Sequence, residues 1–443
     1  MGNRERVWGV VAATAVVGLL AGCSGSSSDG TASGQPSPTR TGPVSLTFWG
    51  KTTGQKAQVA LWNKEHPDIH VTYVEQSASD ADMVTAVQNA AKAGKTPDVF
   101  EMPRGTSVSF LVEGVTQDIS KWFTNDDGAF APDAFSWAKV GDAEVGVPYA
   151  ANPTFNAINK VTFGKYGLSA PTDWTEAVEQ AKKMNVDDVK SFNFPGEDPS
   201  YLRDFATQNG AEWWSADGDS WKIGFTSDAS LKAGDLVQQI LDADLDSNYT
   251  FIEWDALMQY FSSGKLSQFT TSTWQLPAYE SNFAKSVGDW KVAHYPKEPG
   301  ATNLVSPNYY NAYGVAKTAS DPAAAVEFAR WLSTDADSVA ILADTKTGSG
   351  TFPVVADPTP YIEDLLPQKL LGSDKADAPA VVEGAVKTSR AMKDGPDQAA
   401  ALQELADWWA KAVTGKVKVR DVLEHMQTWT INDLKSKNIS VSE

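Results

Sequence analysis

The sequence has very little cysteine and histidine, and it lacks the common catalytic and nucleotide-binding motifs. One cysteine, Cys23, occurs in 443 residues, so no internal disulfide can form. Only four histidines are present, which leaves few nitrogen ligands for a metal ion. The motifs G-x-S-x-G, G-x-x-x-x-G-K-[ST] and G-x-G-x-x-G do not occur. We therefore expect no catalytic residues, no bound metal and no cofactor.

Positive charge is also scarce, because 37 Lys and Arg residues stand against 56 Asp and Glu residues. A chain of net charge −19 offers little surface for neutralising phosphates, which argues against nucleic acid as a partner. Tryptophan, in contrast, is abundant at 16 residues. Some of these rings must form the core, but so many in one chain also suit a ligand with flat apolar faces, such as a sugar.

The lone cysteine follows an N-terminal apolar segment. Two arginines precede the apolar residues 7–20, which are too few to span a bilayer, since a span needs about 20. This pattern is typical of a signal peptide. The sequence Leu20-Ala21-Gly22-Cys23 resembles the lipobox of bacterial lipoproteins, in which the cysteine is acylated and becomes the first residue of the mature chain. The alternative is an ordinary signal peptide that happens to contain a cysteine.

Residues 23–43 follow the proposed cleavage site. From residue 24 to residue 43 they include 6 Ser, 4 Gly, 3 Pro and 3 Thr. Such a composition has nothing apolar to bury and predicts a disordered tether. Together with Cys23, the tether predicts a protein on the extracytoplasmic face of the cell membrane, attached by its lipid alone.

The folded part begins with an alternation of strand and helix patterns. Residues 44–50 and 68–76 alternate apolar and polar side chains, which predicts strands, and residues 54–65 between them predict a helix. This order indicates a parallel crossover at the start of an α/β domain. Further helices are predicted at 80–93, after Asp173, after Asp321, within 398–415 and at 419–434, and a short buried strand that runs into a loop within 96–105.

Other local patterns give weak chemical signals. His66 and His70 have the spacing of a zinc helix, but Pro67 between them breaks any helix. Asp217 and Asp219 lack the other ligands of a calcium loop and better fit a hairpin turn. The alternative function is a glycoside hydrolase, which needs only two carboxylates. Its candidates are Glu253 and Asp255 around Trp254, and Glu101 in a loop.

From residue 44 onward, the chain resembles the sugar-binding family of extracellular solute-binding proteins of ABC importers, which includes maltose-binding protein. The segments that carry the resemblance are "TPDVFEMPRG", "EVGVPYAANPTFNAINKVTFGKYGLSAPTDWTEAVEQAKKM", "FSSGKLSQFTTSTWQLP" and "YGVAKTASDPAAAVEFARWLST", in this order. The resemblance implies an α/β fold of two lobes with a hinge, a ligand cleft between the lobes and no catalysis. One lobe would contain residues 44–149 and 312–352, and the other residues 150–311 and 353–443.

The resemblance also implies a carbohydrate ligand, a di- or oligosaccharide, and delivery to the permease subunits of an ABC importer by a monomeric binding protein. Trp274 matches the aromatic residue that stacks on sugar rings in this family. Polar contacts are expected from Glu101 and Arg104 in the loop after the first-lobe strand, and from Asn152 at the hinge. The remaining candidates for ligand binding, each of which could instead be a packing residue, are Trp49, Tyr149, Tyr309, Tyr310, Asn311 and Phe352.

One departure from the family pattern lies in residues 306–314, "SPNYYNAYG". Many relatives carry a Gly-Gly pair before the returning strand, whereas this chain has two tyrosines and an asparagine. These side chains would fill space near the ligand, so the size of the sugar stays open. Trp408 and Trp409 are adjacent on a predicted helix, so at most one of them can face a cleft.

Overall fold

The computed structural model describes residues 42–442 except residues 78, 126–127, 136–137 and 284. A six-stranded sheet in the order β14-β6-β13-β3-β1-β2 forms the framework of the first part of the chain. Its strands are β1 (Val44–Gly50), β2 (Ile69–Glu75), β3 (Val99–Met102), β6 (Val147–Ala151), β13 (Tyr310–Val315) and β14 (Phe352–Pro353). Strands β2 and β3 both run parallel to β1, whereas β13 is antiparallel to β3 and β6. The sheet therefore combines residues that lie more than 200 positions apart.

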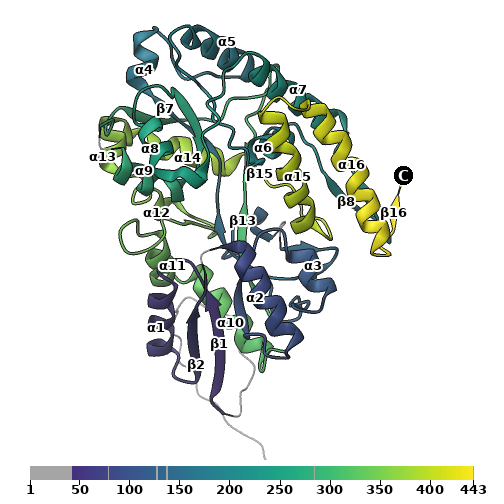
Figure 1. Ribbon diagram of the computed structural model, residues 1–443. Coiled ribbons are helices and arrows are strands. Elements are labelled where there is room, and N and C mark those ends of the chain that lie inside the picture. The colour runs from purple at the N-terminus through teal and green to yellow at the C-terminus, as the bar shows by residue number, and fades with distance from the viewer. Residues whose placement is uncertain (1–41, 78, 126–127, 136–137, 284, 443) are drawn as a thin grey trace, which may run out of the picture. The chain divides into compact units, whose positions relative to one another are not determined.

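The N-terminal crossover follows directly from the local sequence. Leu46 and Phe48 of β1 are buried while Ser45 and Thr47 are exposed, as the alternation predicts. Helix α1 (Gln55–Glu65) joins β1 to β2, and Trp62 of this helix is fully buried. Its indole donates a hydrogen bond to the carbonyl of Ile69 at 2.9 Å, which fixes the helix against the next strand. The predicted strand–helix–strand crossover is confirmed, and β1 and β2 lie side by side in Figure 1.

Polar residues cap the N-termini of two helices at the positions that the sequence predicts. Asp173 accepts a hydrogen bond from the backbone of Glu176 at 2.9 Å at the start of α5 (Trp174–Asn185). The side chain of Glu176 bonds the backbone of Thr172 rather than that of Asp173, so the reciprocal bond lies one residue earlier than in a capping box. Asp321 caps α10 (Pro322–Thr334) in the same way as Asp173 caps α5.

A smaller antiparallel sheet lies in the central part of the chain. It has the order β10-β7-β11, with β7 (Phe155–Asn159) in the middle, β10 (Gln268–Thr271) on one side and β11 (Trp290–Ala293) on the other. Its apolar side chains, such as Phe269 and Trp290, belong to the same hydrophobic cluster as the six-stranded sheet. The predicted turn at residues 217–220 is confirmed as a hairpin between β8 (Trp214–Asp217) and β9 (Ser220–Ile223).

A second hydrophobic core is built mainly from helices. Helices α15 (Gln398–Val413) and α16 (Val419–Ser436) lie side by side, as Figure 1 shows, and pack with α7 (Asp228–Asp242). Trp174, Trp213, Trp214 and Trp409 are fully buried in this core. Of the two adjacent tryptophans, Trp409 therefore faces the core, while Trp408 packs at its edge.

The remaining elements are mostly short. The helices are α2 (Asp80–Lys92), α3 (Ser107–Val112), α4 (Lys160–Lys165), α6 (Ser200–Gln208), α8 (Trp254–Phe261), α9 (Leu276–Asn282), α11 (Ala336–Ala343), α12 (Thr359–Ile362), α13 (Gln368–Leu371) and α14 (Ala378–Lys387). The short strands are β4 (Lys139–Val140), β5 (Ala143–Glu144), β12 (Ser306–Pro307), β15 (Ser389–Arg390) and β16 (Val441–Ser442). Among the described residues there are also four 3₁₀ helices: η1 (Pro132–Phe135), η2 (Phe251–Glu253), η3 (Thr273–Gln275) and η4 (Gly372–Ala376). Across the residues that the structure describes, we find no helix with both the length and the apolar character of a bilayer span.

Candidate functional site

Two cavities with shared walls bring several of the predicted binding residues together. The first has a volume of about 400 Å³ and is lined by Arg104, Asn152, Trp274 and Tyr309, among others. The second has a volume of about 380 Å³ and is lined by Arg104, Asn152 and Trp274, and also by Glu101, Tyr149 and Asn311. Because Arg104, Asn152 and Trp274 line both, the two cavities meet at these three side chains. We call them the aromatic cavity and the polar cavity.

The aromatic cavity contains flat apolar rings beside a few polar groups. Its rings include five that the sequence did not single out as ligand contacts: Tyr201, Phe251, Phe261, Phe269 and Tyr279. Trp254, which lies between the two carboxylates considered for glycoside hydrolysis, is another lining residue and is partly exposed. The polar lining groups include Asp198, Asp204 and the hydroxyl-bearing residues Thr270 and Thr271. Such a mixture of rings, hydroxyls and carboxylates suits a ligand with apolar faces and hydroxyl edges.

Trp274 occupies the most accessible position among these rings. Strand β10 ends at Thr271, and Trp274 follows in η3. The Gln275 side chain accepts a hydrogen bond from the backbone of Ser272 at 3.2 Å and so closes this turn. The turn leaves Trp274 50% exposed while its neighbour Thr273 is fully buried. Trp274 therefore contributes to the lining of both cavities from an exposed position in this turn.

Glu101 lies within β3 and not in the predicted loop after the strand. It lines the polar cavity, but its carboxylate already accepts hydrogen bonds from within the protein. It accepts hydrogen bonds from the side chains of Thr52, Gln55 and Tyr149 at 2.9, 3.0 and 2.7 Å. The backbone amides of Lys51 and Thr52 donate to the same carboxylate at 3.1 and 3.2 Å. Burial and the negative charge of Glu101 raise the pKa of Tyr149 well above its usual value, so the phenol stays a donor. This geometry makes Glu101 a residue that positions the 51–52 turn and Tyr149.

Arg104 is exposed, whereas Asn152 is held by hydrogen bonds to a neighbouring segment. The exposed guanidinium of Arg104 lies 3.9 Å from the carboxylate of Asp80 and 5.8 Å from the centre of the Tyr309 ring. The side-chain nitrogen of Asn152 donates to the carbonyl of Tyr309 at 2.9 Å, and its backbone amide donates to the same oxygen at 2.8 Å. Asn152 thus ties the end of β6 to the segment before β13.

Three predicted residues lie outside the lining of both cavities. Tyr310 and Phe352 are buried in the hydrophobic cluster of the six-stranded sheet, where both pair with Ala151 of β6. Trp49 lies near the end of β1, where it pairs with Val74 and Phe100. All three lie in strands, and their side chains pack against or within the core. Cys23 lies outside the described residues.

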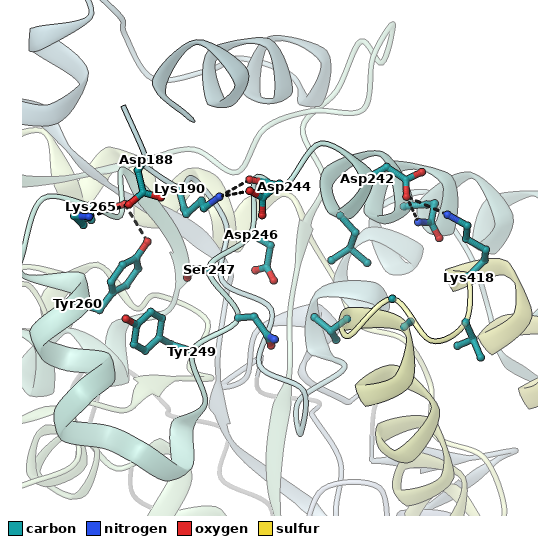
Figure 2. Close-up of a pocket in the computed structure, with 17 residues that line it drawn as sticks. Asp188, Lys190, Asp242, Asp244, Asp246, Ser247, Tyr249, Tyr260, Lys265 and Lys418 are labelled. Atoms are coloured by element: carbon teal, nitrogen blue, oxygen red, sulfur yellow. Dashed lines mark hydrogen bonds and ion pairs between the residues drawn. The ribbon is translucent and has the colours of Figure 1, made fainter. Parts of the chain in front are cut away.

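A third cavity, with a volume of about 600 Å³, is strongly charged and lies elsewhere in the chain (Figure 2). Its basic groups are paired with its acidic groups: Lys265 with Asp188 at 2.8 Å, Lys190 with Asp244 at 2.8 Å and Lys418 with Asp242 at 3.1 Å. Asp246 also lines it and accepts a hydrogen bond from the backbone of Phe194 at 2.6 Å. These contacts satisfy the charges internally, so the aromatic and polar cavities remain the candidate site. Within the described residues, no group of three or more His, Cys, Asp or Glu side chains is arranged to hold a metal ion.

Comparison with known proteins identifies the family. Residues 50–338 match the family model described as bacterial extracellular solute-binding protein. The match covers well over half of the chain, so this protein belongs to that family, as the sequence motifs predict. It is a solute-binding protein and not an enzyme. A comparison with curated protein sequences gave no match.

Solved structures confirm the α/β fold of this class. The galacto-N-biose/lacto-N-biose I-binding protein of an ABC transporter from Bifidobacterium longum, in complex with lacto-N-biose, is 22% identical, with a TM-score of 0.78 over 91% of this chain and 100% of that one. An ABC transporter-associated binding protein from B. animalis subsp. lactis, with β-1,6-galactobiose, is 18% identical (TM-score 0.74; 90% and 100% covered). Maltose-bound MalE3 from T. maritima is 20% identical (TM-score 0.66; 87% and 98% covered).

Proposed function

We propose that this protein captures a di- or oligosaccharide in the aromatic and polar cavities and delivers it to the permease subunits of an ABC importer. The observation that carries the proposal is the convergence of Trp274, Arg104 and Asn152 on both cavities. Two cavities of about 400 and 380 Å³ that share three lining residues offer room for more than one sugar ring. The similar solved structures, which are complexes with lacto-N-biose, β-1,6-galactobiose and maltose, support the same class of ligand.

The proposed lobes give this site a simple mechanism. One lobe comprises residues 44–149 and 312–352, and the other residues 150–311 and 353–443. The strands of the six-stranded sheet lie in 44–151, 310–315 and 352–353. These ranges agree with the proposed bounds of the first lobe to within two residues, which supports that lobe. Arg104 then belongs to one lobe, and Trp274 and Tyr309 to the other. A sugar that contacts both sides favours the closed arrangement, which the importer can distinguish from the open one.

A panel of saccharides tests this function. We expect at least one di- or oligosaccharide among lacto-N-biose, β-1,6-galactobiose, maltose and longer maltodextrins to raise the melting temperature of the purified protein, since a ligand that binds only the folded state stabilises it. The rise should grow with sugar concentration, and the sugar should be recovered intact. Release of reducing ends would contradict a binding function. Failure of every saccharide to shift the melting temperature, while the protein unfolds cooperatively, would contradict a sugar ligand.

We also propose that the protein is anchored to the extracytoplasmic face of the cell membrane through a lipid on Cys23. The support is the lipobox-like sequence at residues 20–23 and the tether-like composition of residues 24–43. Two or three acyl chains hold a protein stably where a single chain binds reversibly.

Replacing Cys23 with Ser tests the anchor. We expect the Cys23→Ser protein to lose incorporation of a labelled fatty acid, and to be found in the medium or as an unprocessed precursor. Ser24→Ala, which leaves the thiol in place, is the matched control and should remain labelled and membrane-bound. Labelling and membrane attachment of Cys23→Ser at the level of the control would overturn the proposal.

A further inference from the structure

One carboxylate in the aromatic cavity is buried without a basic partner. Asp204, on α6, lines this cavity and is only 5% exposed. Its Oδ1 accepts a hydrogen bond from the hydroxyl of Tyr309, another lining residue. Among the described residues, this is the one hydrogen bond that Asp204 receives through its side chain, so Oδ2 remains available at the cavity wall. A buried carboxylate with an unused oxygen is costly unless a further donor arrives.

The charge of Arg203 favours the ionised form of Asp204, but the ion pair that the structure shows for Arg203 is with Asp394 and not with Asp204. The titratable or charged neighbours are Asp198 in the loop before α6, Arg203 and Tyr201 on α6, Tyr295 after β11, Tyr309 before β13, Asp394 after β15, and Arg104 over the Tyr309 ring. Arg203, the nearest cation along the chain, lies 3.6 Å from Asp394 and donates to the carbonyl of Met392 at 3.3 Å. Asp198 adds a second negative charge on the same side.

These surroundings decide the protonation of Asp204 in the empty protein. Desolvation by burial raises the pKa of Asp204 to about 7, although the hydrogen bond from Tyr309 favours the ionised form. Near neutral pH the group is therefore divided between the acid and the carboxylate. The acid has one oxygen that carries the proton, whereas the carboxylate can accept hydrogen bonds from two neighbouring hydroxyls with both oxygens. Sugar hydroxyls supply such donors, and charge-assisted hydrogen bonds are stronger than neutral ones.

We propose that Asp204 binds the hydroxyls of the ligand as a carboxylate, so that capture of a sugar releases a proton from this side chain to the solvent. The proposal rests on the proposed function in requiring a ligand with hydroxyl donors. No covalent bond to the ligand forms or breaks: the O–H bond of the Asp204 acid is broken, and the proton passes to water or buffer. Sugar affinity then depends on pH. It is lower at pH values at which the Asp204 carboxyl is protonated, because the group must first lose its proton.

Titration calorimetry of the full chain with the saccharide found in the panel tests this linkage. At pH 7 we expect about half a proton to be released per sugar bound, seen as a difference in heat between phosphate and Tris buffers, because a group of pKa about 7 is half protonated there. The association constant should rise about tenfold from pH 6 to pH 8 and then level off, because only the ionised form binds. Asp204→Asn should bind more weakly, without proton release and without this slope.

A matched control uses Asp246, a second buried carboxyl. Burial raises the pKa of Asp246 to about 7 as well, but this residue lines the charged cavity in Figure 2 and neither part of the candidate site. Asp246→Asn should therefore keep the proton release and the pH slope of the unmodified protein. Loss of both in Asp246→Asn, with both kept in Asp204→Asn, would overturn the assignment.

A second variant keeps the proposal testable if Asp204→Asn does not fold. Tyr309→Phe removes the hydrogen bond that stabilises the ionised Asp204, so the midpoint of the affinity–pH curve should move to higher pH. An unchanged midpoint in Tyr309→Phe would contradict the proposal. Sugar binding by the unmodified protein without proton release would also overturn it, and would leave the proposed function intact. Failure of all sugars to bind would instead be seen earlier, in the melting panel.

Discussion

Replacing Trp274 with Ala is expected to remove most of the sugar affinity while leaving the ligand-free protein folded. The ring is 50% exposed and lines both cavities, so its loss opens little space in a core. An aromatic anchor at the centre of a binding site contributes about 2 kcal/mol or more, which corresponds to a loss of roughly thirtyfold or greater in affinity. Calorimetry with the saccharide from the panel measures the affinity, and a ligand-free melting curve measures the stability.

Trp408→Ala is the matched control for this variant. Trp408 stacks on His425 with ring centres 3.8 Å apart, and it lines neither the aromatic nor the polar cavity. Its removal should leave the sugar affinity within about twofold of the original, because no ligand contact is lost. A Trp274→Ala protein that melts far below the original and still binds sugar normally would show that the ring is a packing residue. The ligand-free melting temperature should instead stay within a few degrees.

The local elements of the fold could be predicted because their causes are local. The alternation in β1 and β2 determines which side chains face the core, and Asp173 and Asp321 begin their helices by accepting hydrogen bonds from backbone amides three residues later. The end of β10 could not be predicted in the same way. The residues around Trp274 favour a strand by composition, but the bond from the backbone of Ser272 to Gln275 turns the chain first.

The site was only partly predictable, because its walls come from distant segments. Trp274, Arg104, Asn152 and Tyr309 could be named from motifs along the chain, whereas Asp204 carries no motif. Its importance depends on burial and on a bond to Tyr309, which lies 105 residues away in the sequence. Glu101 shows the opposite case. The sequence predicts it in a loop as a ligand contact, but the structure places it within β3 and gives its carboxylate five internal donors.

The two adjacent tryptophans of α15 give the largest expected effect on stability. Trp409 is fully buried in the second core, 5.7 Å from the ring of Phe194, and its indole donates to the carbonyl of Pro195 at 2.8 Å. Trp409→Ala should lower the free energy of unfolding by about 3–5 kcal/mol, because it leaves a cavity and also an unpaired buried carbonyl.

Trp408→Ala, one residue earlier on the same helix, provides the comparison for Trp409→Ala. The partly buried Trp408 ring contacts His425 and the ammonium of Lys411 at 4.2 Å, so its loss should cost on the order of 1 kcal/mol. Urea unfolding of the ligand-free proteins, followed by circular dichroism, measures both changes. Where the Trp409→Ala protein is still folded, its sugar affinity should be retained, since Trp409 lines neither cavity of the candidate site. If Trp409 belongs to the core, removing its ring should lower the free energy of unfolding several times more than removing the ring of Trp408. Equal losses of stability in the two variants would therefore contradict this assignment.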